Sequence, residues 1–156
     1  MNPNTALARS RRIPVLVADA DPDTRSLYSD LLMMAGCEAI EALDGRDALV
    51  KAFSQSPALV ITETRLPILD GYALCDVLRN DSATRSIPIL VVTTETRIPM
   101  IERVRGAGVS GVLKKPVTPD ALLSEIRRVL EQAKRPRQSA NASSQSEQKR
   151  RPLLKS

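Results

Sequence analysis

The chain has 156 residues, no histidine, and a net charge of +5 from 23 Lys and Arg against 18 Asp and Glu side chains. This length has room for one domain with terminal segments. The lack of histidine excludes the commonest metal ligand, the usual general base and a histidine phosphoryl donor within the chain. No apolar stretch approaches the roughly 20 residues that span a bilayer, and no signal-type segment precedes the first strand. We therefore expect a cytoplasmic protein.

The charges divide the chain into three parts. Residues 13–133 carry a balance of −4, whereas the two ends together carry +9. Residues 134–156 are rich in Arg, Lys, Gln, Ser and Pro and have little to bury, which is typical of a disordered segment. We expect a flexible basic segment at 1–12, one globular domain at 13–133 and a disordered basic tail at 134–156. The high isoelectric point is thus a property of the ends.

The first half of the domain predicts two strand–helix pairs. An apolar run at 13–18 indicates a buried strand, and Asp21 is expected to cap the next helix. Gly36 ends that helix as its C′ residue. A short strand at 37–42 and a helix capped by Asp44 follow. The side chains expected to face the core from these helices are Leu27, Leu31, Leu32, Met34, Ala48, Leu49, Ala52 and Phe53.

The second half predicts three more strands, each followed by a helix. The expected bounds are 59–62, 87–93 and 109–113 for the strands and 72–80, 99–105 and 119–130 for the helices. In the loop before the first of these helices, Gly71 is expected to adopt a positive φ. The core-facing side chains of the first and last helices are expected to be Leu74, Val77, Leu78, Leu122, Leu123, Ile126, Val129 and Leu130. Five apolar strands alternating with five helices predict an α/β domain with a doubly wound parallel sheet.

Polar side chains stand at the ends of four of the predicted strands. These residues are Asp19, Glu63, Thr93 and Lys115. The carboxyl ends of parallel strands meet at one edge of the sheet, where such folds hold their functional groups. Two acids, a hydroxyl and an ammonium converging there predict a phosphate-handling site.

With a Pro-x-x-Asp-Gly loop and a Lys-Pro pair in the same order, these residues resemble the response regulator receiver (CheY-like) family over about residues 13–133. The spacing makes the resemblance specific, because Thr93 follows Glu63 by thirty residues and Lys115 follows Thr93 by twenty-two. The resemblance implies a flavodoxin-like (βα)5 fold with strand order 2-1-3-4-5. It also implies a role in two-component or phosphorelay signal transduction.

By the same resemblance, Glu63 occupies the phosphoacceptor position, where the family has Asp. Thr93 matches the hydroxyl that swings towards the phosphoryl group, and Lys115 matches the lysine that pairs with that group. The bond between Lys115 and Pro116 is usually cis in the family. Val112 replaces the aromatic switch residue that is common three places before the lysine.

The resemblance further implies a divalent metal site that is altered here. Asp19, Glu63 and the carbonyl of Arg65 stand at the metal-binding positions, but Ala20 replaces the second of the paired acids. Mg²⁺ depends on several hard oxygen ligands, so we expect its binding to be weakened or lost, and no cofactor to be required. Asp21, one place beyond Ala20, either helps to bind the cation or only caps its helix.

Three explanations of Glu63 remain open. It is an ordinary phosphoryl acceptor, a permanent stand-in for the phosphorylated state that reaches Lys115 and Thr93, or a structural partner of Lys115. Its carboxylate lies one methylene farther from the backbone than that of Asp, and a misplacement of about 1 Å costs on the order of 100-fold when attack must be in line. We therefore expect a phosphorylation-independent pseudo-receiver that acts by protein–protein interaction and is not an enzyme. The alternative within the family is a conventional phosphorylatable regulator.

The resemblance also points to a partner face formed by 99–105, 109–113 and 119–130. It would bind a sensor kinase, a downstream target or a second copy of the chain. No effector domain is expected within the sequence. An alternative of another class is an adaptor for nucleic acid or an anionic membrane that works through basic clusters at 134–137 and 149–151. Those clusters contain no aromatic residue for base stacking, so nucleic-acid binding is expected to be weak.

Overall fold

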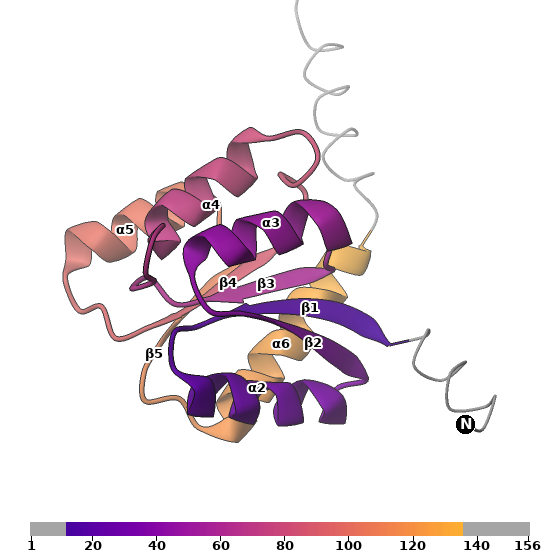
Figure 1. Cartoon of the computed structure of the whole chain (residues 1–156). Coiled ribbons are helices and arrows are strands. Elements are labelled where there is room, and N and C mark those ends of the chain that lie inside the picture. Colours follow the sequence, from indigo (N-terminus) through magenta and orange to yellow (C-terminus); the bar gives the residue numbers. More distant parts are fainter. Residues whose placement is uncertain (1–11, 136–156) are drawn as a thin grey trace, which may run out of the picture.

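The computed structural model describes residues 12–135. In this part of the chain, five strands form one parallel sheet in the order β2-β1-β3-β4-β5 (Figure 1). The strands are β1 (Ile13–Ala18), β2 (Cys37–Ala42), β3 (Leu59–Thr62), β4 (Ile89–Thr93) and β5 (Gly111–Lys114). The helices are α2 (Pro22–Met34), α3 (Gly45–Gln55), α4 (Gly71–Asn80), α5 (Ile98–Gly106) and α6 (Pro119–Lys134). The α/β class and the strand order are confirmed.

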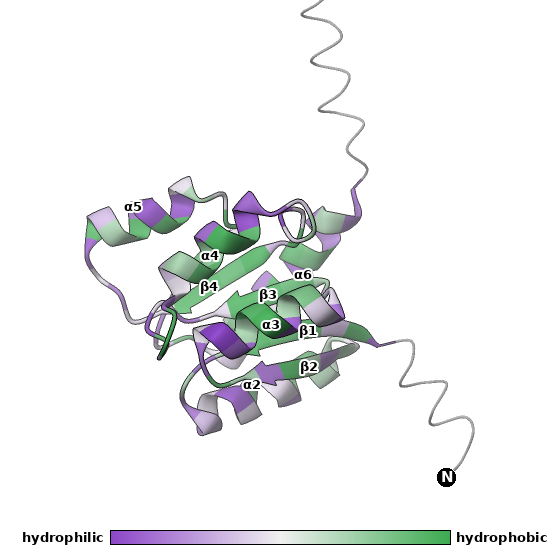
Figure 2. Ribbon diagram, turned by 45° about the horizontal axis from the view of Figure 1, so that its top comes forward, coloured by the Kyte–Doolittle hydropathy of each residue, from purple (hydrophilic) through white to green (hydrophobic). Residues whose placement is uncertain are grey.

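The sheet separates two hydrophobic cores. Helices α2 and α6 pack on one face, and α3, α4 and α5 pack on the other (Figure 1). Alternate residues of a strand point to opposite faces, so Val15 and Val17 belong to the first core and Leu16 to the second. Figure 2 shows the hydrophobic residues concentrated on the central strands, between helices that carry both hydrophilic and hydrophobic residues. Central strands buried on both sides explain the continuous apolar runs of the sequence.

Side-chain caps begin four of the five helices between residues 12 and 135. Asp21, Asp44, Asp70 and Thr118 each accept a hydrogen bond from the backbone N–H three residues later. Helix α5 has Arg97 at its N-cap position and no side-chain cap bond. The caps predicted at Asp21 and Asp44 are confirmed, and α5 is the helix with the weakest start.

The apolar stripe of α2 differs from the prediction. Met34 is 68% exposed and Leu27 is 47% exposed, whereas Tyr28 and Arg25 are buried. Leu27 and Met34 share helical spacing with the buried Leu31, so periodicity alone could not place the edge of the stripe. Contact with the sheet turns the buried face towards Tyr28. Two further side chains expected in the core, on α3 and α4, are also largely exposed: Phe53 and Val77.

Two strands begin later than predicted. The N–H of Ile87 donates to the carbonyl of Thr84 at 3.0 Å in a turn, and Pro88 has no N–H, so β4 begins only at Ile89. Gly108, with φ 78°, turns the chain after α5, and β5 therefore starts at Gly111 and pairs with β4. The expected starts at 87 and 109 were two residues early in each case.

Gly71 has a different role from the one predicted. It does not adopt a positive φ; the left-handed residue of that loop is Ile68, at φ 70°. A Cβ on Gly71 would lie only 2.2 Å from the carbonyl oxygen of Glu63. The amide of Gly71 donates to the carbonyl of Thr64 at 2.8 Å. The missing side chain thus lets the start of α4 pack directly against the end of β3.

The expected terminal segments lie mostly outside the described residues. Helix α6 continues to Lys134, one residue into the segment assigned to the tail, and residues 1–11 and 136–156 are not described. Among the helices between residues 12 and 135, none has both the length and the apolar character that a membrane crossing requires.

Candidate functional site

Four of the predicted site residues come together at the carboxyl ends of the strands. Asp19 directly follows β1, Glu63 follows β3, Thr93 ends β4 and Lys115 follows β5. The two acids and Thr93 are buried, and Lys115 is half-buried. Asp21 does not join them: its exposed carboxylate caps α2 by accepting from the amide of Thr24 at 3.2 Å and from its hydroxyl at 2.6 Å.

Lys115 connects the two acids. Its Nζ lies 2.8 Å from Oδ2 of Asp19 and 3.1 Å from Oε2 of Glu63. The backbone holds this lysine in place, because its N–H donates to the carbonyl of Thr93 at 2.8 Å. The peptide bond between Lys115 and Pro116 is cis, as the family resemblance implied. One ammonium therefore neutralises part of the charge of two buried carboxylates.

The other oxygen of Glu63 is bound by Thr64, a residue that the sequence analysis missed. Oε1 accepts from the amide of Thr64 at 2.6 Å and from its hydroxyl at 3.0 Å. The Thr64 hydroxyl lies 2.7 Å from the hydroxyl of Thr93, which also accepts from the amide of Glu95 at 3.0 Å. Because each hydroxyl has one proton, Thr93 donates to Thr64 and Thr64 donates to Glu63. The only signal for Thr64 was its place directly after Glu63.

Both charged groups of the ion pair are stabilised in their ionised forms. Burial tends to raise the pKa of Glu63, but the Thr93 hydroxyl acting through that of Thr64, the Lys115 ammonium and the Thr64 amide outweigh it, and the pKa lies below its ordinary value. Burial tends to lower the pKa of Lys115, but Asp19 and Glu63 raise it above its ordinary value. The site thus holds a permanent carboxylate–ammonium network at neutral pH.

The residues present do not fit a Mg²⁺ site. The two oxygens of Asp19 accept from the amide of Asp21 at 2.9 Å and from Lys115, and those of Glu63 accept from Thr64 and Lys115. Ala20 adds no oxygen ligand from its side chain. Among residues 12–135, no three His, Cys, Asp or Glu side chains gather where they could hold a metal. A divalent cation would have to displace an ammonium and find its remaining ligands elsewhere.

A second ion pair borders the site. The buried Glu95 binds Arg97, with Nε 2.7 Å from Oε1, and this guanidinium holds the pKa of Glu95 at about 2. Together with Ala20, Thr64 and Tyr72, this pair lines a cavity of about 510 Å³. The hydroxyl of Tyr72 is buried there with no hydrogen-bond partner among the described residues. No local sequence signal marks Glu95, Arg97 or Tyr72, because only the fold brings them to the site.

Comparisons with known proteins agree with this fold. A model of the response regulator receiver domain matches residues 15–127. The protein PilG of Pseudomonas aeruginosa is 31% identical over 119 residues, which cover 76% of this chain and 88% of PilG. The DNA-binding dual master transcriptional regulator RpaA of Synechocystis sp. is 32% identical over 131 residues, which cover 83% of this chain and 54% of RpaA. The chain thus spans about half the length of that regulator.

A solved structure is similar to this chain in both fold and sequence. The chemotaxis response regulator CheY4 of Vibrio cholerae superposes with a TM-score of 0.71 and 33% identity, over 76% of this chain and 98% of CheY4. The family match covers well over half of the chain and includes every strand-end residue of the site. This protein therefore belongs to the response regulator receiver domain family.

Proposed function

We propose that this receiver domain signals without being phosphorylated and acts by binding a protein partner. As a receiver domain it belongs to two-component signalling, in which receivers work with kinases or effectors. In the proposal, the carboxylate of Glu63 supplies a permanent negative charge where other receivers gain one by phosphorylation. The observation that carries the proposal is the ion pair between Glu63 Oε2 and Lys115 Nζ at 3.1 Å.

The hydrogen bonds of Glu63 support the loss of phosphorylation. A carboxylate that attacks a phosphoryl group needs an oxygen free to approach the phosphorus in line. Here Thr64 binds Oε1 and Lys115 binds Oε2, so attack would require breaking one of these contacts. The incoming phosphoryl group would also lack a well-formed metal site, because the neighbouring Ala20 carries no carboxylate.

The same contacts support a fixed signalling state. The Thr93 hydroxyl is connected to Glu63 through Thr64, so the end of β4 is tied to the end of β3 without a phosphoryl group. The adjoining chain leads into α5, where Ile98 is 72% exposed next to the exposed Arg97. We propose that the partner, or a second copy of the chain, docks on the face of α5, β5 and α6.

The first test is chemical. The full chain is incubated with acetyl phosphate or phosphoramidate and Mg²⁺, and its intact mass is measured. We expect no stoichiometric gain of a phosphoryl group. A gain of one phosphoryl group per chain, lost in the Glu63→Gln variant, would instead make the protein a conventional response regulator.

The second test asks whether partner binding depends on the negative charge of Glu63. Partner capture is compared for the wild type, Glu63→Gln and the control Glu38→Gln, which makes the same change at an exposed position of β2. We expect Glu63→Gln to weaken capture at least tenfold and Glu38→Gln to leave it unchanged. Equal capture by all three proteins would mean that Glu63 only pairs with Lys115 structurally.

A further inference from the structure

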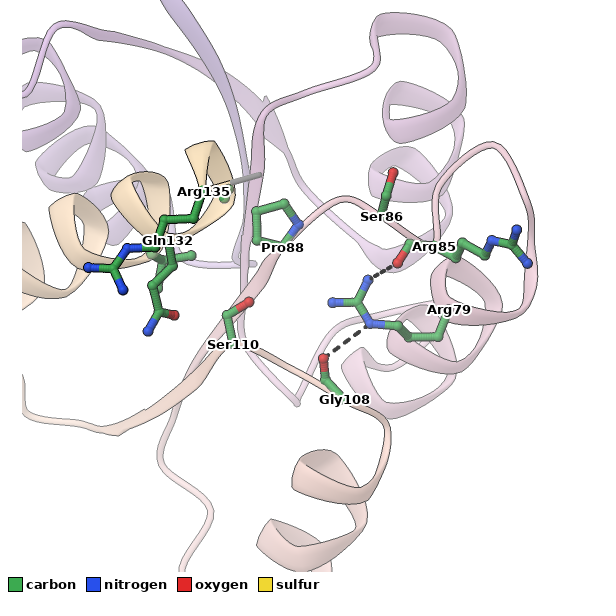
Figure 3. Close-up of a pocket in the computed structure, with 10 residues that line it drawn as sticks. Arg79, Arg85, Ser86, Pro88, Gly108, Ser110, Gln132 and Arg135 are labelled. Carbon is green, nitrogen blue, oxygen red and sulfur yellow. Dashed lines mark hydrogen bonds between the residues drawn. The ribbon is translucent and has the colours of Figure 1, made fainter. Parts of the chain in front are cut away.

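A basic cleft lies at the opposite end of the sheet from Glu63. It has a volume of about 500 Å³ and is bordered by residues from the end of α4, the segments before β4 and β5, and the end of α6 (Figure 3). Three of its lining residues are arginines and three are neutral polar residues: Arg79, Arg85, Arg135, Ser86, Ser110 and Gln132. No Asp or Glu lines it. The cleft is therefore chemically distinct from the acidic site at the other strand ends.

Arg79 is held rigidly at the wall of this cleft. Its Nε donates to the carbonyl of Gly108 at 3.3 Å, and its Nη1 donates to the carbonyls of Arg85 at 2.8 Å and Ile87 at 2.7 Å. These bonds use three of the five guanidinium protons. Figure 3 shows the remaining nitrogen, Nη2, directed towards the space beside Ser110. Two donors of Arg79 thus face the cleft in a fixed orientation, whereas the exposed side chains of Arg85 and Arg135 extend away from it (Figure 3).

The positive charge in the cleft is not compensated. Within residues 12–135, no carboxylate lies in ion-pair distance of Arg79, Arg85 or Arg135. Arg79 is half-buried, and this burial lowers its pKa. Carbonyl dipoles hold the guanidinium in place but leave its net charge. A partly desolvated cation without a counter-charge favours the binding of an anion.

We propose that this cleft binds a compact ligand that carries phosphate. A guanidinium presents paired N–H groups that match phosphate oxygens, and the hydroxyl of Ser110, which faces Arg79 across the cleft in Figure 3, offers a further donor. The volume lies in the range of small-molecule sites. No aromatic residue lines the cleft to stack on a base, which favours a polyphosphate or sugar phosphate over the bases of a nucleic acid.

The tail of the chain itself is an unsuitable occupant. Residues 136–156 contain five Lys and Arg but only one acid, Glu147. Like charges repel, so this segment would not fill a cleft that holds the uncompensated guanidinium of Arg79. Since it follows directly after Arg135, it adds to the positive potential that attracts an anion.

The test is calorimetric titration of the full chain with inorganic triphosphate. We expect one triphosphate per chain and an affinity that falls as ionic strength rises. Arg79→Gln should weaken binding at least about tenfold, since each charge-assisted bond contributes that much or more. Arg127→Gln, which removes the same charge from an exposed position of α6 outside the cleft, should leave the affinity unchanged.

A second variant is needed as a control for misfolding, because Arg79→Gln also removes three hydrogen bonds to backbone carbonyls. The Ser110→Ala variant removes a half-buried hydroxyl that faces the cleft and makes no hydrogen bond within the described residues. We expect it to keep the wild-type circular dichroism and thermal midpoint, yet to lose at least tenfold in affinity. Amide shifts of Gly108 and Ser110 on titration would locate the ligand.

Three results would overturn the proposal. One is the absence of saturable triphosphate binding at low ionic strength. Another is equal weakening by Arg127→Gln, or by a tail variant with Lys149, Arg150 and Arg151 changed to Gln, which would indicate a general effect of charge. The third is tighter binding of a short oligodeoxythymidylate than of triphosphate, which would assign the cleft to a nucleic-acid backbone.

Discussion

Lys115→Met gives the sharpest test of the ion-pair network. Lys115 Nζ lies within 3.1 Å of a carboxylate oxygen of both Asp19 and Glu63, and each carboxylate side chain is only 7% exposed. Removing one partner of a buried pair costs about 3–5 kcal/mol, because the remaining charge is left uncompensated. The Lys115 side chain is 22% exposed, so water screens part of the interaction. We therefore expect a loss of about 3 kcal/mol in the free energy of unfolding at neutral pH.

The effect of Glu63 protonation on stability should reverse in this variant. In the wild type, the pKa of Glu63 is lower in the folded state than its ordinary value of 4.5. Glu63 therefore contributes fully to the free energy of unfolding above pH 4.5, and this contribution is lost as the pH falls through the folded-state pKa. The pKa of Lys115 is higher in the folded state than its ordinary value of 10.5. Lys115 therefore contributes fully to the free energy of unfolding below pH 10.5, and this contribution is lost as the pH rises through the folded-state pKa. Without the ammonium, burial raises the pKa of Glu63. The folded state then binds protons more readily, and stability increases from about pH 7 to about pH 5.

Urea unfolding at these two pH values measures both effects. Lys114→Met is the matched control, because Lys114 is exposed and has no ion pair within the described residues; it should change stability by no more than about 0.5 kcal/mol. A loss below about 1 kcal/mol for Lys115→Met, with the wild-type pH slope, would refute the reasoning. The pair would then be no stronger than an exposed surface pair.

Three further predictions follow from the contacts. Gly71→Ala should destabilise the fold by several kcal/mol in urea unfolding, since the new Cβ would lie 2.2 Å from the carbonyl oxygen of Glu63. The control Gly106→Ala adds a Cβ that meets nothing within 4 Å and should stabilise α5 by about 0.5–1 kcal/mol. Equal effects of the two substitutions would contradict this packing. Burial raises the pKa of Cys75 to about 12, so we expect iodoacetamide to modify this thiol only in denaturant, as measured by intact mass. Rapid labelling of Cys75 in the native protein would show instead that the thiol is accessible. Glu63→Asp should restore acetyl phosphate labelling only together with Ala20→Asp, because reach and metal ligands must both be repaired; full labelling of the single variant would show that the metal site was never impaired.

Much of the fold was predictable because its signals are local. The apolar run at 13–18 encodes a strand buried on both faces, and Asp21, Asp44 and Thr118 mark helix starts through bonds to N–H groups three residues away. Parallel strands bring their carboxyl ends to one edge. The strand-end acids, hydroxyl and ammonium could therefore be grouped before their distances were known.

The rest depended on contacts between distant segments. Whether the buried face of α2 includes Leu27 or Tyr28 is decided by how the helix rests on the sheet, since both positions fit helical spacing. Thr64 acquires its role because β3 and β4 bring its hydroxyl within 2.7 Å of the Thr93 hydroxyl.

The sequence by itself determined the fold class, the strand order through its family resemblance, and the four residues that meet at the strand ends. Periodicity, capping and spacing along the chain carry that information. Only the tertiary structure decided that Lys115 binds both acids, that Thr64 connects Glu63 to Thr93, and that Arg79, Arg85 and Arg135 line one cleft. Hydrogen bonds and ion pairs act over a few ångströms, so they depend on distances that sequence separation does not encode.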